Sequence, residues 1–336
     1  MDGARTLFLS CALAACTALA AQAAGPLPTL NILPGSLTVS GVSSGGYMAT
    51  QYQVAYSKDV QGAGVIAAGP WFCAQGMLTR ALDECMKGGP AGPDVGPLVA
   101  ALRGSARGGS VDDPSWLAPD RVWLFHGAKD TTVGAAVTDS LLRFYRAFLP
   151  PERIYYETQV PAAHGFPTDG RGGSCAIAQS PWINDCSYDA AGQMLRYLYD
   201  DLREPSGTVA GELRVFDQAR YAAGGMLASM EDEGFLFVPK DCAAGRPCRL
   251  HVAFHGCRQG GGFVGRAFAR DAGYNRWADV NRIVVLYPQA AKSLVWPFNP
   301  QGCWDWWGYS GPNYATRSGL QLRAVHRMLR ALSRHP

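Results

Sequence analysis

Residues 36–56 read SLTVSGVSSGGYMATQYQVAY, and this stretch decides the fold that we predict. It begins with a short extended run that ends at Gly41, and from Gly46 to Tyr56 it can be helical. Between them lies Gly41-Val42-Ser43-Ser44-Gly45, a G-x-S-x-G pattern. In a sharp turn from strand to helix, such glycines leave room for the neighbouring elements, and the serine at the tip is strained and accessible. Ser43 is therefore the candidate nucleophile.

The rest of the chain continues this alternation of strand and helix. A helix is expected at Asp189–Leu202, and another at the C-terminus, where Val325, Met328, Leu329 and Leu332 share a helical face. Further strands are expected at Gly62–Ala68, Arg121–Phe125, Arg153–Val160, Gly234–Val238, Arg249–Phe254 and Arg282–Tyr287. This pattern predicts an α/β domain with a largely parallel sheet. Residues 90–116 and 288–313 are rich in turn formers and are expected to be surface loops.

A nucleophilic serine needs a histidine base, and the base needs a carboxylate that orients it. His164 lies in a loop just after the predicted strand Arg153–Val160, and Asp130 follows the strand Arg121–Phe125. Loops at the carboxyl ends of parallel strands are where α/β enzymes build their sites. The order Ser43, Asp130, His164 is also the order found in α/β-hydrolases. Asp169, in the Gly-rich loop that follows His164, is the rival carboxylate.

An oxyanion hole needs two N–H groups that point at the developing charge. The residue after the nucleophile, Ser44, supplies one of them. The second usually comes from an H-G loop after an earlier strand, but too few residues precede Ser43 for such a loop. The match that we choose lies far downstream, at His255-Gly256-Cys257 after the strand Arg249–Phe254. We therefore predict a permuted order of the sheet, with the Cys257 N–H as the second donor.

Composition excludes several classes of protein. The 336 residues carry a net charge of +3 and no long run of like charge, which excludes a basic surface for nucleic acid. A hydrophobic fraction of 48% excludes a disordered chain. Neither a zinc-ligand spacing nor a phosphate-binding loop occurs, so we expect no metal and no cofactor. After the N-terminus no apolar stretch is long enough to span a membrane. A separate expectation is that the protein is a monomer.

The first 23 residues read as a signal peptide. Arg5 is followed by the apolar run Leu7–Ala20 and by an A-x-A cleavage site that ends at Ala23. Cys16 closes a stretch similar to a bacterial lipobox, so lipid anchoring at Cys16 is the alternative. We expect export to the periplasm or the medium, and a single catalytic domain over residues 24–336.

Eight cysteines remain after the signal peptide, and an even number in an exported chain suggests disulfides. Eight cysteines allow 105 pairings, so the connectivity stays open at this point. The spacing favours neighbours as partners: Cys73 with Cys85, Cys175 with Cys186, Cys242 with Cys248, and Cys257 with the remaining Cys303.

Together, several of these motifs resemble the poly(3-hydroxybutyrate) depolymerase family. The segments that carry the resemblance are GVSSGGYM from Gly41, FHGAKD from Phe125, AHGF from Ala163, FHGC from Phe254 and GCWDWWGY from Gly302. The resemblance covers nearly all of the chain after the signal peptide, and it is to the single-domain, circularly permuted α/β-hydrolase type, with helices on both faces of the sheet. It implies a triad of Ser43, Asp130 and His164, with Ser44 and Cys257 as the oxyanion amides. Many bacterial members carry a further polymer-binding domain, and none is expected here.

Aromatic residues near these motifs are candidates for a polyester-binding cleft, although large aromatics also fill cores. The candidates are Trp304, Trp306, Trp307, Trp71 and Phe166, with Phe72, Trp296 and Phe298 nearby. The expected activity is hydrolysis of poly- or oligo(3-hydroxyalkanoate) esters through an acyl-enzyme. The alternatives are a carbohydrate esterase acting on feruloyl or acetylxylan esters, and an exported binding protein without catalysis.

Overall fold

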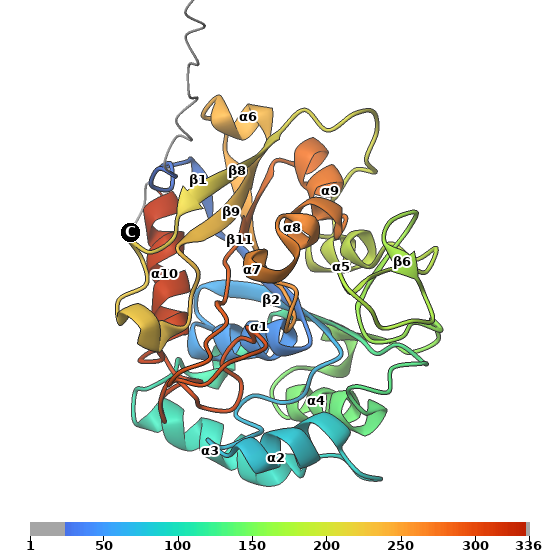
Figure 1. Ribbon diagram of the computed structural model, residues 1–336, viewed down its shortest axis with the longest axis vertical. Coiled ribbons are helices and arrows are strands. Elements are labelled where there is room, and N and C mark those ends of the chain that lie inside the picture. The colour runs from blue at the N-terminus through green and yellow to red at the C-terminus, as the bar shows by residue number, and fades with distance from the viewer. Residues whose placement is uncertain (1–23, 334–336) are drawn as a thin grey trace, which may run out of the picture.

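A computed structural model describes residues 24–333 and shows an eight-stranded sheet (Figure 1). The predicted signal peptide, including Cys16, lies outside the described residues. Across the sheet the strands follow the order β4-β3-β2-β1-β10-β11-β9-β8. In this order their bounds are Ile154–Glu157, Arg121–Phe125, Val60–Ile66, Ile32–Val42, Cys248–Phe254, Ile283–Tyr287, Glu233–Val238 and Glu212–Asp217.

Strand β1 lies in the middle of the sheet and pairs in parallel with β2 on one side and β10 on the other. Strands β3, β4 and β11 extend the parallel part, whereas β9 runs antiparallel to both β11 and β8. The largely parallel α/β sheet that we predicted is therefore confirmed. Gly41 of β1 is in register with Phe254 of β10, so the strand that ends in the H-G loop lies beside the strand that ends at Ser43.

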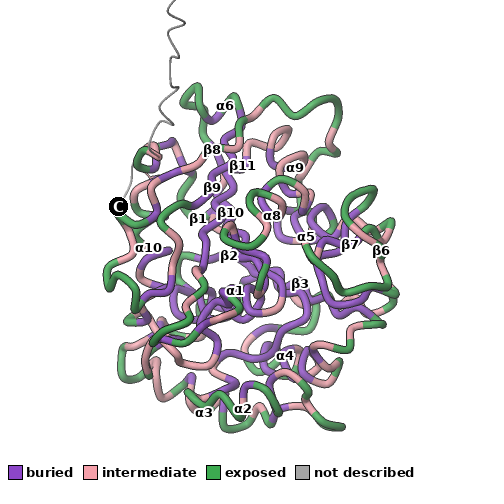
Figure 2. The backbone as a smooth tube through the Cα atoms, in the orientation of Figure 1, coloured by how far each residue is buried: buried purple, intermediate pink, exposed green. Residues whose placement is uncertain are grey.

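Helices cover both faces of the sheet, and β2 shows why. Successive residues of a strand point to opposite faces. A Cβ on Gly64 would meet Met194 of α5 (Ala190–Leu198), whereas the side chain of Val65 lies against Gly46 of α1 (Ser44–Ala55). The two helices therefore pack on opposite faces, and the strands between them are buried (Figure 2). The other helices are α2 (Leu78–Leu82), α3 (Val95–Arg107), α4 (Ala135–Arg146), α6 (Lys240–Ala243), α7 (Gly261–Val264), α8 (Ala267–Asp271), α9 (Tyr274–Asn281) and α10 (Leu320–Leu332).

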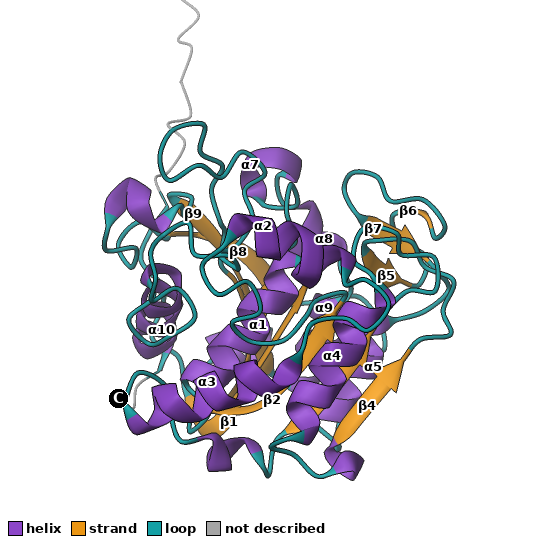
Figure 3. Ribbon diagram, turned by 90° about the horizontal axis from the view of Figure 1, so that it is seen from below, coloured by secondary structure: helices purple, strands orange, loops and turns teal. Residues whose placement is uncertain are grey.

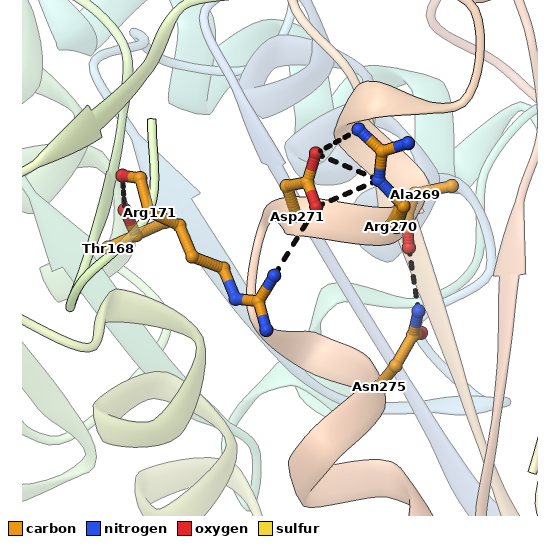
Figure 4. Close-up of polar contacts among 6 residues, drawn as sticks. All are labelled: Thr168, Arg171, Ala269, Arg270, Asp271 and Asn275. Atoms are coloured by element: carbon orange, nitrogen blue, oxygen red, sulfur yellow. Dashed lines mark hydrogen bonds and ion pairs between the residues drawn. The ribbon is translucent and has the colours of Figure 1, made fainter. Parts of the chain in front are cut away.

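A second, small sheet lies to one side of the main sheet (Figure 3). Its strand order is β5 (Phe166–Thr168), β7 (Ile183–Asp185) and β6 (Gly173–Ser174). It is linked to the region of α8 by an ion pair of 3.5 Å between Arg171 and Asp271, a carboxylate that also pairs with Arg270 (Figure 4). The exposed arginines make this link weak, because solvent screens such pairs. Its first strand, β5, begins two residues after His164, so the small sheet lies next to the loop of this histidine.

The structure differs from the sequence predictions at two places, α3 and β8. Residues 90–116 were expected to form a loop but contain α3, whose N-cap Asp94 accepts a hydrogen bond from the N–H of Gly96. Pro97 is tolerated there because it lies in the first turn of the helix, where an N–H has no helical acceptor. The edge strand β8 was not predicted. No helix within residues 24–333 has the length and apolar character needed to cross a bilayer.

Candidate active site

Ser43 stands at the turn between β1 and α1. Its backbone has φ 59° and ψ −124°, a conformation that costs a non-glycine residue about 1–3 kcal/mol. The N–H of Ser43 donates to the carbonyl oxygen of Ile66 at 2.9 Å, so the end of the neighbouring strand β2 holds the turn. The side chain is consequently presented at the carboxyl edge of the sheet.

The glycines at positions 41 and 45 are required by close approach of backbone. A Cβ on Gly41 would lie 2.2 Å from the carbonyl oxygen of Gly45, the first turn of α1. A Cβ on Gly45 would lie 2.3 Å from the carbonyl oxygen of Phe254, at the end of β10. The G-x-S-x-G pattern therefore lets the elbow turn sharply and lets the strand with the H-G loop pack directly against it.

The structure brings His164 and Asp130 together from loops that follow β4 and β3. His164 Nδ1 lies 2.7 Å from Asp130 Oδ2, and both side chains are nearly buried. The other carboxylate oxygen of Asp130 accepts the N–H groups of Thr132 at 2.8 Å and Val133 at 3.0 Å. With Nδ1 donating to the carboxylate, Nε2 of His164 is left with a lone pair that can accept a proton. The rival Asp169 is exposed and is not a hydrogen-bond partner of His164.

Electrostatics keep Asp130 ionised. Burial acts to raise the pKa of this carboxyl group, but the hydrogen bond and charge of His164 and the N–H of Val133 outweigh it, so the pKa lies below its ordinary value. A carboxylate that stays charged can orient the imidazole and stabilise the imidazolium formed during proton transfer.

Two N–H groups at this edge are candidates for binding an oxyanion. The amides of Ser44 and Cys257 have no acceptor within the described part of the chain, and both residues line the cavity that Ser43 and His164 line. The hydroxyl of Ser44 accepts the N–H of Trp304 at 3.3 Å, which leaves its backbone amide unaffected.

The peptide group between Gly256 and Cys257 is held on several sides. His255 Nε2 accepts the N–H of Ala290 at 3.1 Å, so in the neutral ring the proton is on Nδ1, which donates to the Gly256 carbonyl oxygen at 2.7 Å. Burial lowers the pKa of His255 to about 4, which keeps the ring neutral. The N–H of Gly256 donates to the side-chain oxygen of Gln259 at 2.7 Å. These bonds fix the direction in which the Cys257 N–H points.

A disulfide links the same loop to the tryptophan-rich segment. It joins Cys257 with Cys303, across 46 positions. The remaining bridges join Cys73 with Cys85, Cys175 with Cys186 and Cys242 with Cys248, as the spacing favoured. Four disulfides are typical of proteins that fold in an oxidising compartment outside the cytosol.

A cavity of about 500 Å³ opens at Ser43. Its wall is mainly apolar, and Trp306 and Trp307, both predicted to contact substrate, line it. The ring of Trp306 stacks on Tyr47 with centroids 4.8 Å apart. Trp306 is 8% exposed, and its indole N–H has no partner among the described residues. The cavity can therefore hold an apolar chain.

The other three predicted contact residues, Trp71, Trp304 and Phe166, lie in the core and not on the cavity wall. Trp71 donates its indole N–H to the carbonyl oxygen of Ala315 at 2.8 Å. Trp304 packs edge-on against Phe254, which directly precedes the loop of His255, Gly256 and Cys257, here called the oxyanion loop. Phe166 packs against aromatic rings of α8 and α9. We therefore assign these three residues to the core and not to substrate contact.

Several lining residues were missed by sequence reasoning. Tyr47 is the second residue after the G-x-S-x-G pattern, and its position in the first turns of α1 was the available signal. Arg258 follows Cys257, and Gln259 follows Arg258. Leu78, Leu82 and Met86 come from the α2 region, where no sequence motif marks them. Within residues 24–333 no group of three or more histidines, cysteines or acidic residues is arranged to hold a metal ion.

We compared the chain with protein families and with curated proteins. No protein-family model matches the chain. The chain is 39% identical over 334 residues to a poly(3-hydroxybutyrate) depolymerase of Delftia acidovorans; the match covers 98% of this chain and 66% of the relative, so the chain spans less than two thirds of that protein. It is 38% identical over 318 residues to a polyhydroxybutyrate depolymerase of Talaromyces funiculosus, covering 90% of this chain and 91% of the relative.

Solved structures agree with these relatives. The crystal structure of a PHB depolymerase from Penicillium funiculosum superposes with a TM-score of 0.85 at 36% identity, covering 91% of this chain and 98% of that one. A variant PHB depolymerase in complex with an R3HB trimer superposes with a TM-score of 0.84 at 35% identity, with the same coverage. The chain therefore belongs to the poly(3-hydroxybutyrate) depolymerase family.

Proposed function

We propose that this protein is an exported serine esterase that hydrolyses ester bonds in poly- and oligo(3-hydroxybutyrate). The observation that carries the proposal is the convergence of Ser43 and the Asp130–His164 pair on one apolar cavity, from loops at the ends of three parallel strands. The names of the relatives, and the R3HB trimer bound in one solved structure, support 3-hydroxybutyrate esters as the substrate.

In the proposed reaction, Ser43 Oγ attacks the ester carbonyl carbon while His164 Nε2 takes the hydroxyl proton. Asp130 holds the imidazole through Nδ1 and stabilises its charged form. The amides of Ser44 and Cys257 bind the oxygen that becomes negative in the tetrahedral intermediate. His164 then returns the proton to the leaving alkoxide oxygen, and an alcohol departs from an acyl-Ser43. Water, activated by the same histidine, attacks the acyl group and releases a carboxylic acid.

The cavity surface suits an aliphatic polyester. Three residues of its mouth, Leu78, Leu82 and Phe298, are lining residues with large exposed apolar side chains. Next to Phe298 the chain exposes Leu294, Val295 and Trp296, of which Leu294 is 74% exposed. An exposed apolar surface of this kind marks a binding site.

A product assay tests the proposal. We expect the protein to clear a turbid suspension of amorphous poly(3-hydroxybutyrate), with release of 3-hydroxybutyrate or its short oligomers. A folded protein that leaves the suspension turbid but releases ferulate from a feruloyl ester would instead be a carbohydrate esterase. A protein with neither activity that also resists labelling by an organophosphate would be a non-catalytic binding protein. Mass spectrometry of the secreted protein tests removal of residues 1–23 and any lipid on Cys16.

A further inference from the structure

Arg258 stands out among the residues that line the cavity. Of the described lining residues, it is the only one whose side chain carries a permanent charge, and no aspartate or glutamate lines the cavity. Its guanidinium forms no ion pair with a carboxylate of the described residues, whereas eleven such pairs involve other arginines or His164. The site thus holds one unneutralised positive group in a mainly apolar wall.

The position of Arg258 is fixed from two directions. Its N–H donates to the carbonyl oxygen of Gln301 at 2.7 Å, and its backbone has φ 59°. Its guanidinium carbon lies 4.9 Å from the centre of the Trp182 ring, another lining residue. A cation stacked on an aromatic face still has its N–H groups available at the edge of its plane. The guanidinium is therefore presented at the cavity with its donors unused by any acid.

A planar guanidinium matches a carboxylate through two parallel charge-assisted hydrogen bonds. An oligo(3-hydroxyalkanoate) carries one carboxylate, at the end of the chain that leaves as the alcohol fragment. In a dimer this carboxylate is only four bonds from the scissile carbonyl carbon. Arg258 directly follows Cys257, whose N–H would bind the oxygen of that carbonyl. An anion in the leaving-group part of the cavity would therefore lie close to the guanidinium.

We propose, on the basis of the function proposed above, that Arg258 binds the terminal carboxylate of short 3-hydroxyalkanoate oligomers on the leaving-group side of the scissile ester. Arg258 then determines specificity: it favours cleavage of the last ester bond of a free-acid oligomer. The ester groups in the interior of a long polymer carry no charge and gain nothing from it. The enzyme is thereby suited to convert short oligomers to monomers as well as to cut long chains.

The test compares the (R)-3-hydroxybutyrate dimer as the free acid with its methyl ester, which differs by one charge. We expect Arg258→Gln to raise KM for the free acid by about 3- to 5-fold, because Arg258 is exposed and solvent weakens the charge-assisted hydrogen bonds that the variant loses. KM for the methyl ester should change less than about 2-fold. Arg266→Gln is the matched control, because Arg266 is exposed and also lies over an aromatic ring, Phe235 at 5.9 Å, but outside the cavity.

Hydrolysis of p-nitrophenyl butyrate, which has no carboxylate, reports whether the oxyanion loop of Arg258→Gln is intact. Binding of the free-acid dimer to Ser43→Ala, with and without Arg258→Gln, gives the same comparison without turnover and should show the same loss of affinity. An equal change in KM for acid and ester, or no change for either, would overturn the role of Arg258. A wild-type protein that hydrolyses neither dimer nor polymer would instead overturn the proposed function on which this inference depends.

Discussion

His255 donates a hydrogen bond from Nδ1 to the carbonyl oxygen of Gly256, at 2.7 Å. That carbonyl belongs to the same peptide group as the N–H of Cys257, the second proposed oxyanion donor. A peptide group is planar, so holding its C=O also fixes the direction of its N–H. In the proposed reaction, the imidazole of His255 would therefore act on the oxyanion through this peptide group, without touching the substrate.

His255→Phe, which keeps a ring but removes both ring nitrogens, should lower kcat by about 10- to 100-fold with little change in KM. Losing an oxyanion donor outright costs about 10²–10³ in kcat, and here the donor is loosened and not lost. The matched control is His251→Phe: His251 is also fully buried and bonds Thr38 and Ser40 through its two ring nitrogens. It should lower thermal stability but leave kcat of the folded protein nearly unchanged. Equal kcat losses in the two variants would contradict a specific role for His255.

Ser43→Ala should lower kcat by about 10⁶-fold, as expected for loss of the nucleophile of a triad. The fold should persist, because alanine can retain the backbone of the turn and the 2.9 Å bond from its N–H to Ile66. The measurement is hydrolysis of a soluble ester, together with covalent labelling by an organophosphate. A variant that keeps a tenth of the activity, or that is still labelled, would show that another residue is the nucleophile.

Asp130→Asn should lower kcat by about 10⁴-fold at neutral pH, because the amide no longer orients the tautomer of His164 that has Nε2 free. Asp169→Asn should leave kcat within about 2-fold, since Asp169 is exposed and away from His164 in the hydrogen-bond network. Steady-state kinetics of the two purified variants at one pH makes the comparison. The reverse ranking would transfer the orienting role to Asp169.

Cys303→Ser should affect both stability and turnover. Opening the Cys257–Cys303 bridge should destabilise the fold by about 2–4 kcal/mol and free the loop that carries the Cys257 N–H, lowering kcat more than it changes KM. Cys242→Ser opens the bridge to Cys248, which lies at the amino end of β10, away from the cavity. It should lower stability alone. Peptide mapping without reduction checks the pairing, and equal kinetic defects in both variants would refute the link to the oxyanion loop.

Asp120 should make stability depend on pH. It is buried, and burial raises its pKa to about 8 although a hydrogen bond of 2.7 Å from Gln53 opposes the shift. Between its ordinary value of 3.8 and about 8, the folded chain holds a proton that the unfolded chain has lost. The free energy of unfolding therefore falls as pH rises through this interval.

Asp120→Asn, which keeps an acceptor for Gln53 but cannot ionise, should remove this dependence. We expect the variant to have a higher Tm than the wild type, and this difference in Tm should be larger at pH 8 than at pH 5 by at least about 2 °C. A change of about 1 kcal/mol in stability shifts the Tm of a domain of several hundred residues by about this amount. Thermal unfolding at the two pH values measures it. A gain in Tm that is the same at both would show that Asp120 does not titrate between them.

Local motifs made much of this site predictable from sequence. The turn at Ser43 comes directly after one strand, and the loops of Asp130 and His164 come after two others. Because parallel strands end at the same edge of a sheet, the sequence alone predicts that these three residues lie at one edge. The helix α3 was missed because Gly96 and Pro97 hide a pattern that its N-cap Asp94 marks. Contacts between segments that are far apart in the chain are marked by no local motif, so they could not be predicted from the sequence.

The substrate contacts illustrate the same limit. Trp304 and Trp306 are two positions apart, yet one is in the core against Phe254 and the other lines the cavity. Composition identifies both as large and apolar but does not say which way each ring faces. The roles inferred for His255 and Arg258 depend on Ala290 and Trp182, partners that only the folded chain brings near.

The pairing of β1 with β10 also means that the proposed site is assembled from distant parts of the chain. β1 ends at residue 42, whereas β10 begins at residue 248 and the cysteine that ties its loop is residue 303. The proposed nucleophile thus follows the first strand of the chain, whereas the second proposed oxyanion amide follows a strand in its last third. Such distant strand pairing folds slowly. We therefore expect a chain truncated before β10 to keep the candidate serine but to hydrolyse no ester, because it lacks that amide.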